Sequence, residues 1–306
     1  MKAGTTLEKV LEAGHFAVTA EAGPPKGTSA ESVQRKAELL KNACDAVNVT
    51  DNQTAIVRMS SIAGSAILKQ AGVDPVMQMV VRDRNRLALQ ADILGGIALG
   101  IGNFLALSGD HQKFGNHPTA KGVYDIDSIQ LLQMMKQMRD EKKFINGDDI
   151  SGELPMYIGA ACNPFADPFE YRVSRLEKKI KAGADFIQTQ AVYDVPRFKK
   201  YMEMVCDRGL DKQTHILAGV IPIKSAGMAK YMKNFVSGVI VPDEIITRLS
   251  GAEIPKEEGV KLILEIIEQV REIPGVHGIH IMAVGWEDIV EEMVTKAGLM
   301  PRPVVD

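Results

Sequence analysis

Short apolar runs alternate with longer amphipathic segments along almost the whole chain, and this alternation predicts repeated strand-plus-helix units. The apolar runs predicted as strands lie at residues 16–21, 46–50, 76–81, 104–108, 155–161, 186–190, 215–221 and 278–283. The segments with helical spacing lie at residues 29–41, 61–70, 84–99, 125–142, 168–182, 195–207, 226–234, 242–249, 256–272 and 287–297. Continuous apolar strands such as ILAGVI are typical of a parallel sheet that is buried on both faces.

Eight strand-plus-helix units are the number that closes a parallel (β/α)8 barrel, so the predicted fold class is an α/β TIM barrel. Such barrels often run to about 250 residues or more as one domain, so we expect one catalytic domain over residues 1–306. The alternative is an open doubly wound sheet that binds a dinucleotide. It is disfavoured because the glycine-rich segment at residues 95–102 precedes a predicted strand instead of following one. That segment is predicted to be a helix end and a turn.

The net charge of −3 favours neither nucleic acid nor an anionic membrane as a partner. The three cysteines, Cys44, Cys162 and Cys206, are far apart and form no CxxC pair, so neither disulfides nor a thiolate zinc site are expected. The histidines do not cluster as metal ligands, and we expect no metal. The first residues lack the apolar core of a signal peptide, and no apolar run is long enough to span a bilayer. These features together predict a cytoplasmic protein.

In barrels of this type the chemistry lies at the carboxyl ends of the strands, so the residues that end each predicted strand are the candidates for a site. Two acids are among them. Glu21 lies in the otherwise apolar run VTAEAGPP, and a carboxyl group in an apolar wall retains its proton more readily than in water, as a general acid requires. Asp110 follows the fourth strand. The alternative for both acids is a structural role, as the cap of a loop for Glu21 and as part of a turn for Asp110.

Several segments, in order from about residue 16 to residue 299, resemble the methylenetetrahydrofolate reductase family. The segments that carry the resemblance are VTAEAGPP, VNVTDN, DPVMQMVVRDRNR, ALSGD, KAGADFIQTQAVYD and GVIPI. The resemblance is to the short microbial form of the family, which consists of the catalytic barrel alone. It implies a flavin on the carboxyl face of the barrel and hydride transfer from reduced flavin to methylenetetrahydrofolate, which gives methyltetrahydrofolate.

Carried over position by position, the resemblance assigns Glu21 as the general acid that opens the folate ring and Asp110 as the carboxylate beside flavin and substrate. Gln190 matches a substrate-binding amide. The positions that match cofactor contacts are Thr50, Gln78, Ser108, Gly109, Asp110, Asn163, Arg172, Arg175, Lys178, Lys179 and Ala184. Taken by itself, the basic run at residues 177–181 is more simply explained as a solvent-exposed helix face. The resemblance favours instead a position of Lys178 and Lys179 near the flavin phosphates.

The chain also departs from the family pattern. Ala22 and Gly23 replace an aromatic pair after the catalytic acid, and the last strand ends in AVGW instead of a Leu-Asn-Arg run, which leaves the folate-tail contacts open. Arg172 and Arg175 stand where members that bind FAD have acidic or neutral polar residues, so FMN is an alternative to FAD. The resemblance implies an electron donor that is either NAD(P)H, bound transiently, or a protein redox partner subunit, and we expect an oligomer.

Two other functions remain open on the sequence. One is a flavin-free, pterin-binding TIM-barrel methyltransferase, which would use the same rim of the barrel. The other is a non-catalytic barrel subunit of a larger redox complex. The presence of both Glu21 and Asp110 speaks against the second alternative, but a barrel fold hosts many chemistries and does not decide between them.

Overall fold

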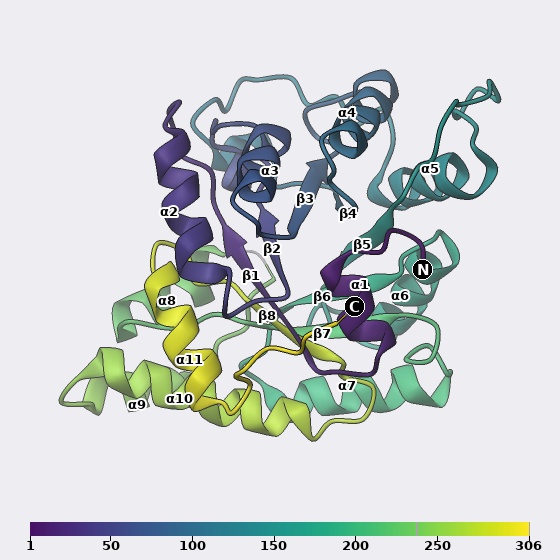
Figure 1. Ribbon diagram of the computed structural model, residues 1–306. Helices are drawn as coiled ribbons and strands as arrows, with labels where there is room; N and C mark the ends of the chain where they lie inside the picture. Colours follow the sequence, from purple (N-terminus) through teal and green to yellow (C-terminus); the bar gives the residue numbers. More distant parts are fainter. Residues whose placement is uncertain (237, 306) are drawn as a thin grey trace.

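The strands form a closed parallel barrel in which each strand pairs with its neighbours in chain order and β1 also pairs with β8 (Figure 1). The computed structural model describes residues 1–236 and 238–305. The strands are β1 (Ala17–Ala22), β2 (Ala46–Val49), β3 (Pro75–Val80), β4 (Asn103–Leu107), β5 (Tyr157–Cys162), β6 (Phe186–Ala191), β7 (His215–Val220) and β8 (Gly278–Ile281). This closure confirms the predicted TIM barrel and excludes the open sheet, whose outer strands would each have a free edge.

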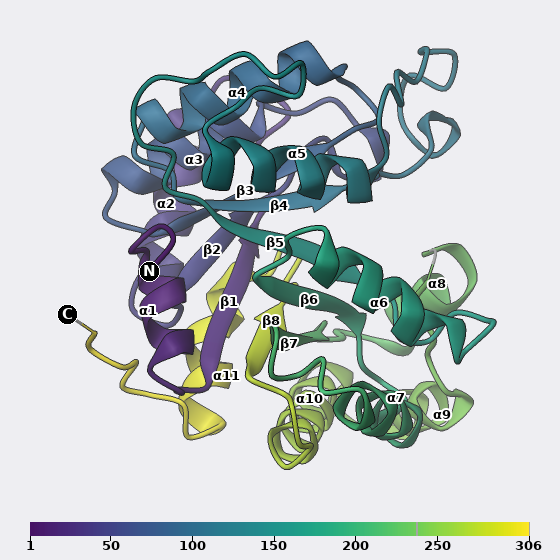
Figure 2. The ribbon, with the colours of Figure 1, turned by 90° about the vertical axis from the view of Figure 1, so that its right-hand side faces the viewer.

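Helices surround the barrel on the outside, as Figures 1 and 2 show. The α-helices are α1 (Thr6–Glu12), α2 (Ala30–Leu40), α3 (Ser61–Gln70), α4 (Arg86–Ala98), α5 (Ser128–Glu141), α6 (Tyr171–Lys181), α7 (Val195–Asp207), α8 (Ala226–Phe235), α9 (Asp243–Gly251), α10 (Pro255–Arg271) and α11 (Val290–Lys296). Short 3-10 turns are η1 (Gln53–Ala55), η2 (Gln112–Phe114) and η3 (Glu287–Ile289). All predicted helical segments are confirmed within a few residues, except that the last one begins as the turn η3.

Local capping explains where the helices begin and end. Ser29 is the N-cap of α2, and its hydroxyl accepts a hydrogen bond of 3.2 Å from the backbone N–H of Ser32. α5 begins at Ser128, three residues later than predicted, because the Asp127 side chain caps it in a reciprocal capping box with Gln130. Gly100, with φ of +80°, ends the turn after α4, which confirms the helix-end interpretation of the glycine-rich segment.

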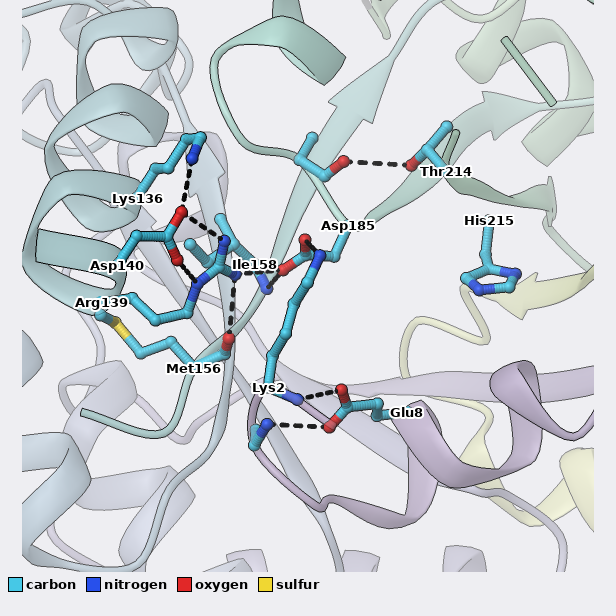
Figure 3. Close-up of polar contacts among 12 residues, drawn as sticks. Lys2, Glu8, Lys136, Arg139, Asp140, Met156, Ile158, Asp185, Thr214 and His215 are labelled. Carbon is cyan, nitrogen blue, oxygen red and sulfur yellow. Dashed lines mark hydrogen bonds and ion pairs between the residues drawn. The ribbon is translucent and has the colours of Figure 1, made fainter. Parts of the chain in front are cut away.

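The sequence pattern did not predict α1, which covers the amino-terminal end of the barrel. Leu7, Val10 and Leu11 of this helix are buried in a cluster with residues from the beginnings of the strands, among them Tyr157 and Phe186. The chain before the helix is also fixed there, because the Glu8 carboxylate accepts hydrogen bonds from backbone N–H groups of residues 2–4 (Figure 3). A seven-residue helix offers too few turns for a clear amphipathic pattern.

Ion pairs continue around the same end of the barrel (Figure 3). Asp185, buried just before β6, accepts hydrogen bonds from Arg139 (2.7 Å) and from the backbone N–H of Ile158 (2.8 Å), and it also pairs with Lys2. Arg139 in turn pairs with Asp140 at 2.6 Å. The buried carboxylate is therefore paired and hydrogen-bonded, as a charge in this position must be. The contacts at the amino-terminal end of the barrel therefore stabilise the fold, and a functional site is expected at the carboxyl-terminal end.

Methionine side chains fill part of the space between the barrel and α5. Met134, Met135 and Met138 are buried in the main hydrophobic core, where their flexible side chains fill space against the barrel. His111 and His117, which the sequence shows in one polar loop, are both exposed. Over the described part of the chain, the structure has no helix with the length and apolar character that crossing a bilayer requires.

Candidate active site

A cavity of about 370 Å³ opens at the carboxyl-terminal end of the barrel, above β4, β5 and β6. Its floor consists of Glu21, Gln78, Gln188 and His280, whose side chains come from four different strands. Its walls consist of the ends of β4 to β6, the beginning of α5 and one face of α6 from Arg172 to Lys179. This volume lies in the range of small-molecule sites, and the position is the one at which barrel enzymes carry their chemistry.

Glu21 is the only acid among the described residues that line this cavity. Its side chain is 11% exposed, so one part of the carboxyl group reaches the cavity. Gln78 Nε2 donates a hydrogen bond of 3.2 Å to Glu21 Oε1, and His280 Nε2 lies 3.7 Å from the same oxygen. The structure therefore differs from the expected apolar wall, because polar groups of β3 and β8 surround the carboxyl group.

A chain of polar side chains continues from Glu21 into the interior of the barrel. His280 Nδ1 lies 2.9 Å from the Thr19 hydroxyl, which accepts a hydrogen bond of 3.2 Å from Gln188 Nε2. Gln188 and Asn48 then exchange two hydrogen bonds, of 2.6 and 3.0 Å. All four residues are at least 97% buried. Sequence reasoning missed His280, Thr19 and Asn48 as site residues, although each is a polar residue inside an apolar strand, which is the signal that singled out Glu21.

Three cations of α6 face the cavity: Arg172, Arg175 and Lys179. Arg172 Nε donates to the carbonyl oxygen of Ala166 at 3.0 Å, and Lys179 donates to the carbonyl oxygen of Ala161. Burial lowers the pKa of Lys179 from its ordinary value. Among the residues that the structure describes, no carboxylate forms an ion pair with any of the three, so the wall carries uncompensated positive charge.

Lys178 does not belong to this wall. It is exposed on the outer face of α6, where its ammonium group lies 5.9 Å from the centre of the Tyr171 ring. Adjacent helix positions point about 100° apart, so one member of the predicted basic pair faces the cavity and the other faces solvent. Lys178 therefore lies on a solvent-exposed helix face, whereas Lys179 lines the cavity.

Asp110 lies outside the lining of the cavity. It is exposed, and its carboxylate accepts a hydrogen bond of 3.1 Å from the backbone N–H of Thr54. Arg82 fixes the loop that carries it, because the guanidinium group donates to the carbonyl oxygens of Asp110 (2.9 Å) and Asn52 (3.2 Å). The buried arginine thus ties together the loops after β2 and β4, and Asp110 stands at the rim of the same barrel end.

The remaining predicted cofactor positions divide between the cavity and other places. Ser108 and Asn163 line the cavity, and Ser108 Oγ forms a hydrogen bond of 3.2 Å with Ser128 Oγ at the start of α5. Gly109 has φ of +81° and forms the turn after β4. Thr50 is buried, and its hydroxyl has no hydrogen-bond partner among the described residues.

Ala184 and Gln190 lie at opposite ends of β6. Gln190, the predicted substrate amide, lines the cavity at the carboxyl end of the strand. Ala184 precedes the amino end, where its carbonyl oxygen accepts a hydrogen bond of 3.3 Å from Thr214. Ala184 is therefore not part of the cavity lining and packs in the hydrophobic core near the amino-terminal end of the barrel, so this cavity gives the predicted cofactor contact no support.

Comparison with protein families gives one match over almost the whole length. The family model described as methylenetetrahydrofolate reductase matches residues 6–298. Methylenetetrahydrofolate reductase 2 of Schizosaccharomyces pombe is 27% identical over 217 residues, which are 66% of this chain and 32% of that protein. A probable methylenetetrahydrofolate reductase (NADPH) of Caenorhabditis elegans is 23% identical over 256 residues, 81% of this chain and 36% of that protein. The chain thus spans about a third of the length of these curated relatives.

Solved structures show the same fold at low sequence identity. An uncharacterized protein from Clostridium thermocellum, described as binding two copies of 5-methyl-5,6,7,8-tetrahydrofolic acid, superposes with a TM-score of 0.67 at 15% identity. The superposition covers 97% of this chain and 100% of that one. An oxaloacetate acetylhydrolase superposes with a TM-score of 0.51 at 9% identity, over 98% of this chain and 85% of that one. At these identities the likeness establishes the barrel fold alone.

Proposed function

The chain belongs to the methylenetetrahydrofolate reductase family, and we propose from this premise that it reduces 5,10-methylenetetrahydrofolate to 5-methyltetrahydrofolate with a bound flavin. The single observation that supports this most is the charge arrangement of the cavity. One carboxyl group, Glu21, stands on the floor, and the cations Arg172, Arg175 and Lys179 stand on the wall. The whole chain then serves as one catalytic domain, in the cytoplasm.

The residues of the cavity fit a flavin nucleotide. Its phosphate is an anion, and guanidinium groups without a carboxylate partner bind phosphate strongly. Arg172, Arg175 and Lys179 would hold the phosphate end, and Gln78, Ser108 and Asn163 line the space for the rest.

When bound and reduced, the flavin supplies the hydride, and the protein supplies the proton and the orientation. Glu21 transfers its proton to a nitrogen of the five-membered folate ring. The carbon–nitrogen bond to that nitrogen breaks, and the methylene carbon is left as an iminium ion on the other nitrogen. That carbon accepts the hydride and becomes the methyl group. Gln190 is the candidate donor to the pterin, and Asp110, at the rim, is the candidate acceptor.

The nature of the flavin follows from which phosphate the wall binds. Two arginines beside Lys179 suit the dianionic terminal phosphate of FMN, and the diphosphate of FAD is the alternative. Mass spectrometry of flavin released from the purified protein distinguishes them. FMN alone supports the terminal-phosphate argument, and FAD alone contradicts it.

The electron donor is NAD(P)H or a protein redox partner. The absence of an aromatic pair after Glu21 favours the protein partner, because residues 22 and 23 are Ala and Gly and offer no ring against a nicotinamide. Rapid oxidation of NADH or NADPH by the purified protein with a folate acceptor would contradict the protein-partner argument. Slow oxidation, together with fast turnover when dithionite reduces the flavin, supports it.

The reaction itself is tested in a single turnover. The protein is loaded with flavin, reduced with dithionite without oxygen and mixed with methylenetetrahydrofolate, and the product is identified by mass spectrometry. We expect one methyltetrahydrofolate per flavin. A reduced flavoprotein that forms no methyltetrahydrofolate would contradict the proposed function, and a protein that cannot retain any flavin would favour a flavin-free pterin enzyme.

A further inference from the structure

We infer that His280 is a positioning residue for Glu21: held as the tautomer with the proton on Nε2, it donates toward Glu21 Oε1 and leaves the transferable proton on Oε2. This inference rests on the proposed function for its catalytic meaning, but the hydrogen-bond arrangement can be tested without any turnover. It concerns a side chain that no family motif in the sequence singled out.

At the cavity end, both protein donors meet the same carboxyl oxygen. Gln78 Nε2 lies 3.2 Å and His280 Nε2 lies 3.7 Å from Glu21 Oε1. The second distance is longer than a hydrogen bond, as contacts at catalytic groups often are before a ligand binds. Oε2 has no partner among the described residues. A carboxylic acid that accepts on one oxygen carries its proton on the other, so the proton of Glu21 faces the cavity.

The imidazole nitrogen that faces Glu21 Oε1 must carry a proton, because this oxygen only accepts, both in the carboxylate and in the acid whose proton lies on Oε2. In a neutral imidazole the other nitrogen, Nδ1, is then an acceptor. The Thr19 hydroxyl lies 2.9 Å from it and can donate, whereas the competing carbonyl oxygen of Ile279 lies 3.4 Å from the same hydroxyl. The shorter contact favours donation to His280.

At the interior end of this series of hydrogen bonds, the donors and acceptors follow the same direction as at the Glu21 end. Once its proton points to His280, the Thr19 oxygen accepts, and Gln188 Nε2 donates to it at 3.2 Å. The orientation of the Gln188 amide is in turn matched by Asn48, which donates at 2.6 Å to Gln188 Oε1 and accepts at 3.0 Å on Oδ1. If the side-chain amides of Gln188 and Asn48 were both rotated by 180°, the two hydrogen bonds between them would still form. The Gln188 oxygen would then face the Thr19 hydroxyl in place of its NH2 group, and the donor to Thr19 would be lost. Both ends therefore agree on one direction for the chain of hydrogen bonds.

The burial of these polar side chains inside the barrel also needs an explanation. The interior of a TIM barrel is normally filled with branched apolar side chains. Thr19, Asn48, Gln188 and His280 occupy it here although burying polar groups brings no net gain over apolar packing. Directly above them stands the only acid of the cavity lining that the structure describes. Orienting that acid is a reason for keeping a polar core at this place.

The tautomer is measured on the flavin-loaded protein labelled with 15N-histidine, by long-range proton–nitrogen correlation at neutral pH. His280→Gln identifies the signals by their loss. We expect His280 to be neutral with the proton on Nε2, and Thr19→Val, which removes the hydroxyl donor but keeps the shape, to shift the population toward the Nδ1 tautomer. A wild-type His280 with the proton on Nδ1, or on both nitrogens, would overturn the inference.

Turnover gives the second readout. We expect His280→Leu and Thr19→Val to lower kcat about tenfold or more with KM and flavin affinity unchanged, because the first removes the donor to Glu21 Oε1 and the second removes the hydroxyl that holds His280 as the Nε2 tautomer. His280→Gln, which retains an N–H donor, should recover part of kcat. His215→Gln, at the opposite end of the barrel, is the matched control and should not alter kcat. Unchanged kcat in Thr19→Val and His280→Leu would refute the positioning role. If the tautomer is as expected and wild-type protein reduces no folate, the hydrogen-bond chain stands and the proposed function fails.

Discussion

Gln78 on β3 donates a hydrogen bond of 3.2 Å to Glu21 on β1, so two side chains 57 residues apart in the sequence meet on the floor of one cavity. β2 lies between the two strands, and the closed barrel brings both side chains to its interior. Gln78 keeps its donor whether Glu21 is ionised or protonated. The acid can therefore lose and regain its proton without losing this contact.

Replacing the acid tests its role directly. Glu21→Gln keeps the size and one acceptor oxygen but has no proton of suitable acidity, so we expect folate reduction to fall by a factor on the order of 10² or more. Flavin content should remain normal in absorbance spectra. Glu12→Gln, an exposed acid at the opposite end of the barrel, is the control. Near-normal turnover of Glu21→Gln would remove the general-acid role.

The two sides of α6 make a second test possible within a few residues. Arg175 lines the cavity and Lys178 is exposed on the outer face. We expect Arg175→Gln to weaken flavin binding about 10- to 100-fold, as for the loss of a hydrogen bond to a charged group. Lys178→Gln, which removes the same charge from the outer face, should leave the dissociation constant unchanged. If a fluorescence titration gave the same flavin dissociation constant for both variants, net charge alone would determine the affinity. The proposal that Arg175 binds the flavin phosphate would then be contradicted.

Asp110 is a predicted site residue that lies at the rim of the barrel end, outside the lining of the cavity. Asp110→Asn keeps an acceptor for the Thr54 N–H but removes a negative charge at the rim. If the carboxylate stands close to bound flavin, its removal favours the reduced, more negative form, so we expect the midpoint potential to rise and folate affinity to fall. Asp149→Asn, on an exposed loop, is the control. An unchanged potential and affinity would exclude Asp110 from the site.

The ion pairs at the amino-terminal end of the barrel predict a pH dependence of stability. Partial burial raises the pKa of Asp140, but hydrogen bonds from Arg139 and Lys136 outweigh it and lower the pKa to about 2 (Figure 3). The folded-state pKa lies below the unfolded value, so the stabilisation is present above about pH 4 and is lost as the pH falls through about 2. We expect Asp140→Asn to lower the urea midpoint at pH 6 and to differ less from wild type at pH 3. A difference that does not change with pH would contradict this.

The packing of α1 against the barrel leads to a prediction about the free energy of unfolding that is independent of activity. Leu7 is fully buried among the strand beginnings, so we expect Leu7→Ala to destabilise the protein by about 2–5 kcal/mol. Leu87→Ala removes the same atoms from a side chain that is 74% exposed and should change stability little. Urea unfolding measures both. Similar values for the two variants would mean that α1 does not close the barrel in solution.

The barrel could be predicted from the sequence because its strands are buried on both faces and its helices on one, which gives two distinct hydrophobic patterns. The carboxyl-end rule identified Glu21, and the family resemblance assigned Gln78 and Gln190; all three line one cavity. The rule could not identify His280, because it considers the residues at a strand's end and His280 lies within β8. It also could not separate Lys178 from Lys179, since only the rotation of α6 decides which of two neighbours faces inward.

The measurement that tests the proposed function most directly is an anaerobic titration of the flavin-loaded protein with methyltetrahydrofolate, followed by absorbance. In the proposed reaction hydride can also pass from methyltetrahydrofolate back to oxidised flavin, so we predict that the yellow absorbance band of the oxidised flavin bleaches. We predict a much slower bleaching in Glu21→Gln, because the proton must then be removed without the acid's carboxylate. A flavin that stays fully oxidised at saturating methyltetrahydrofolate would contradict the account.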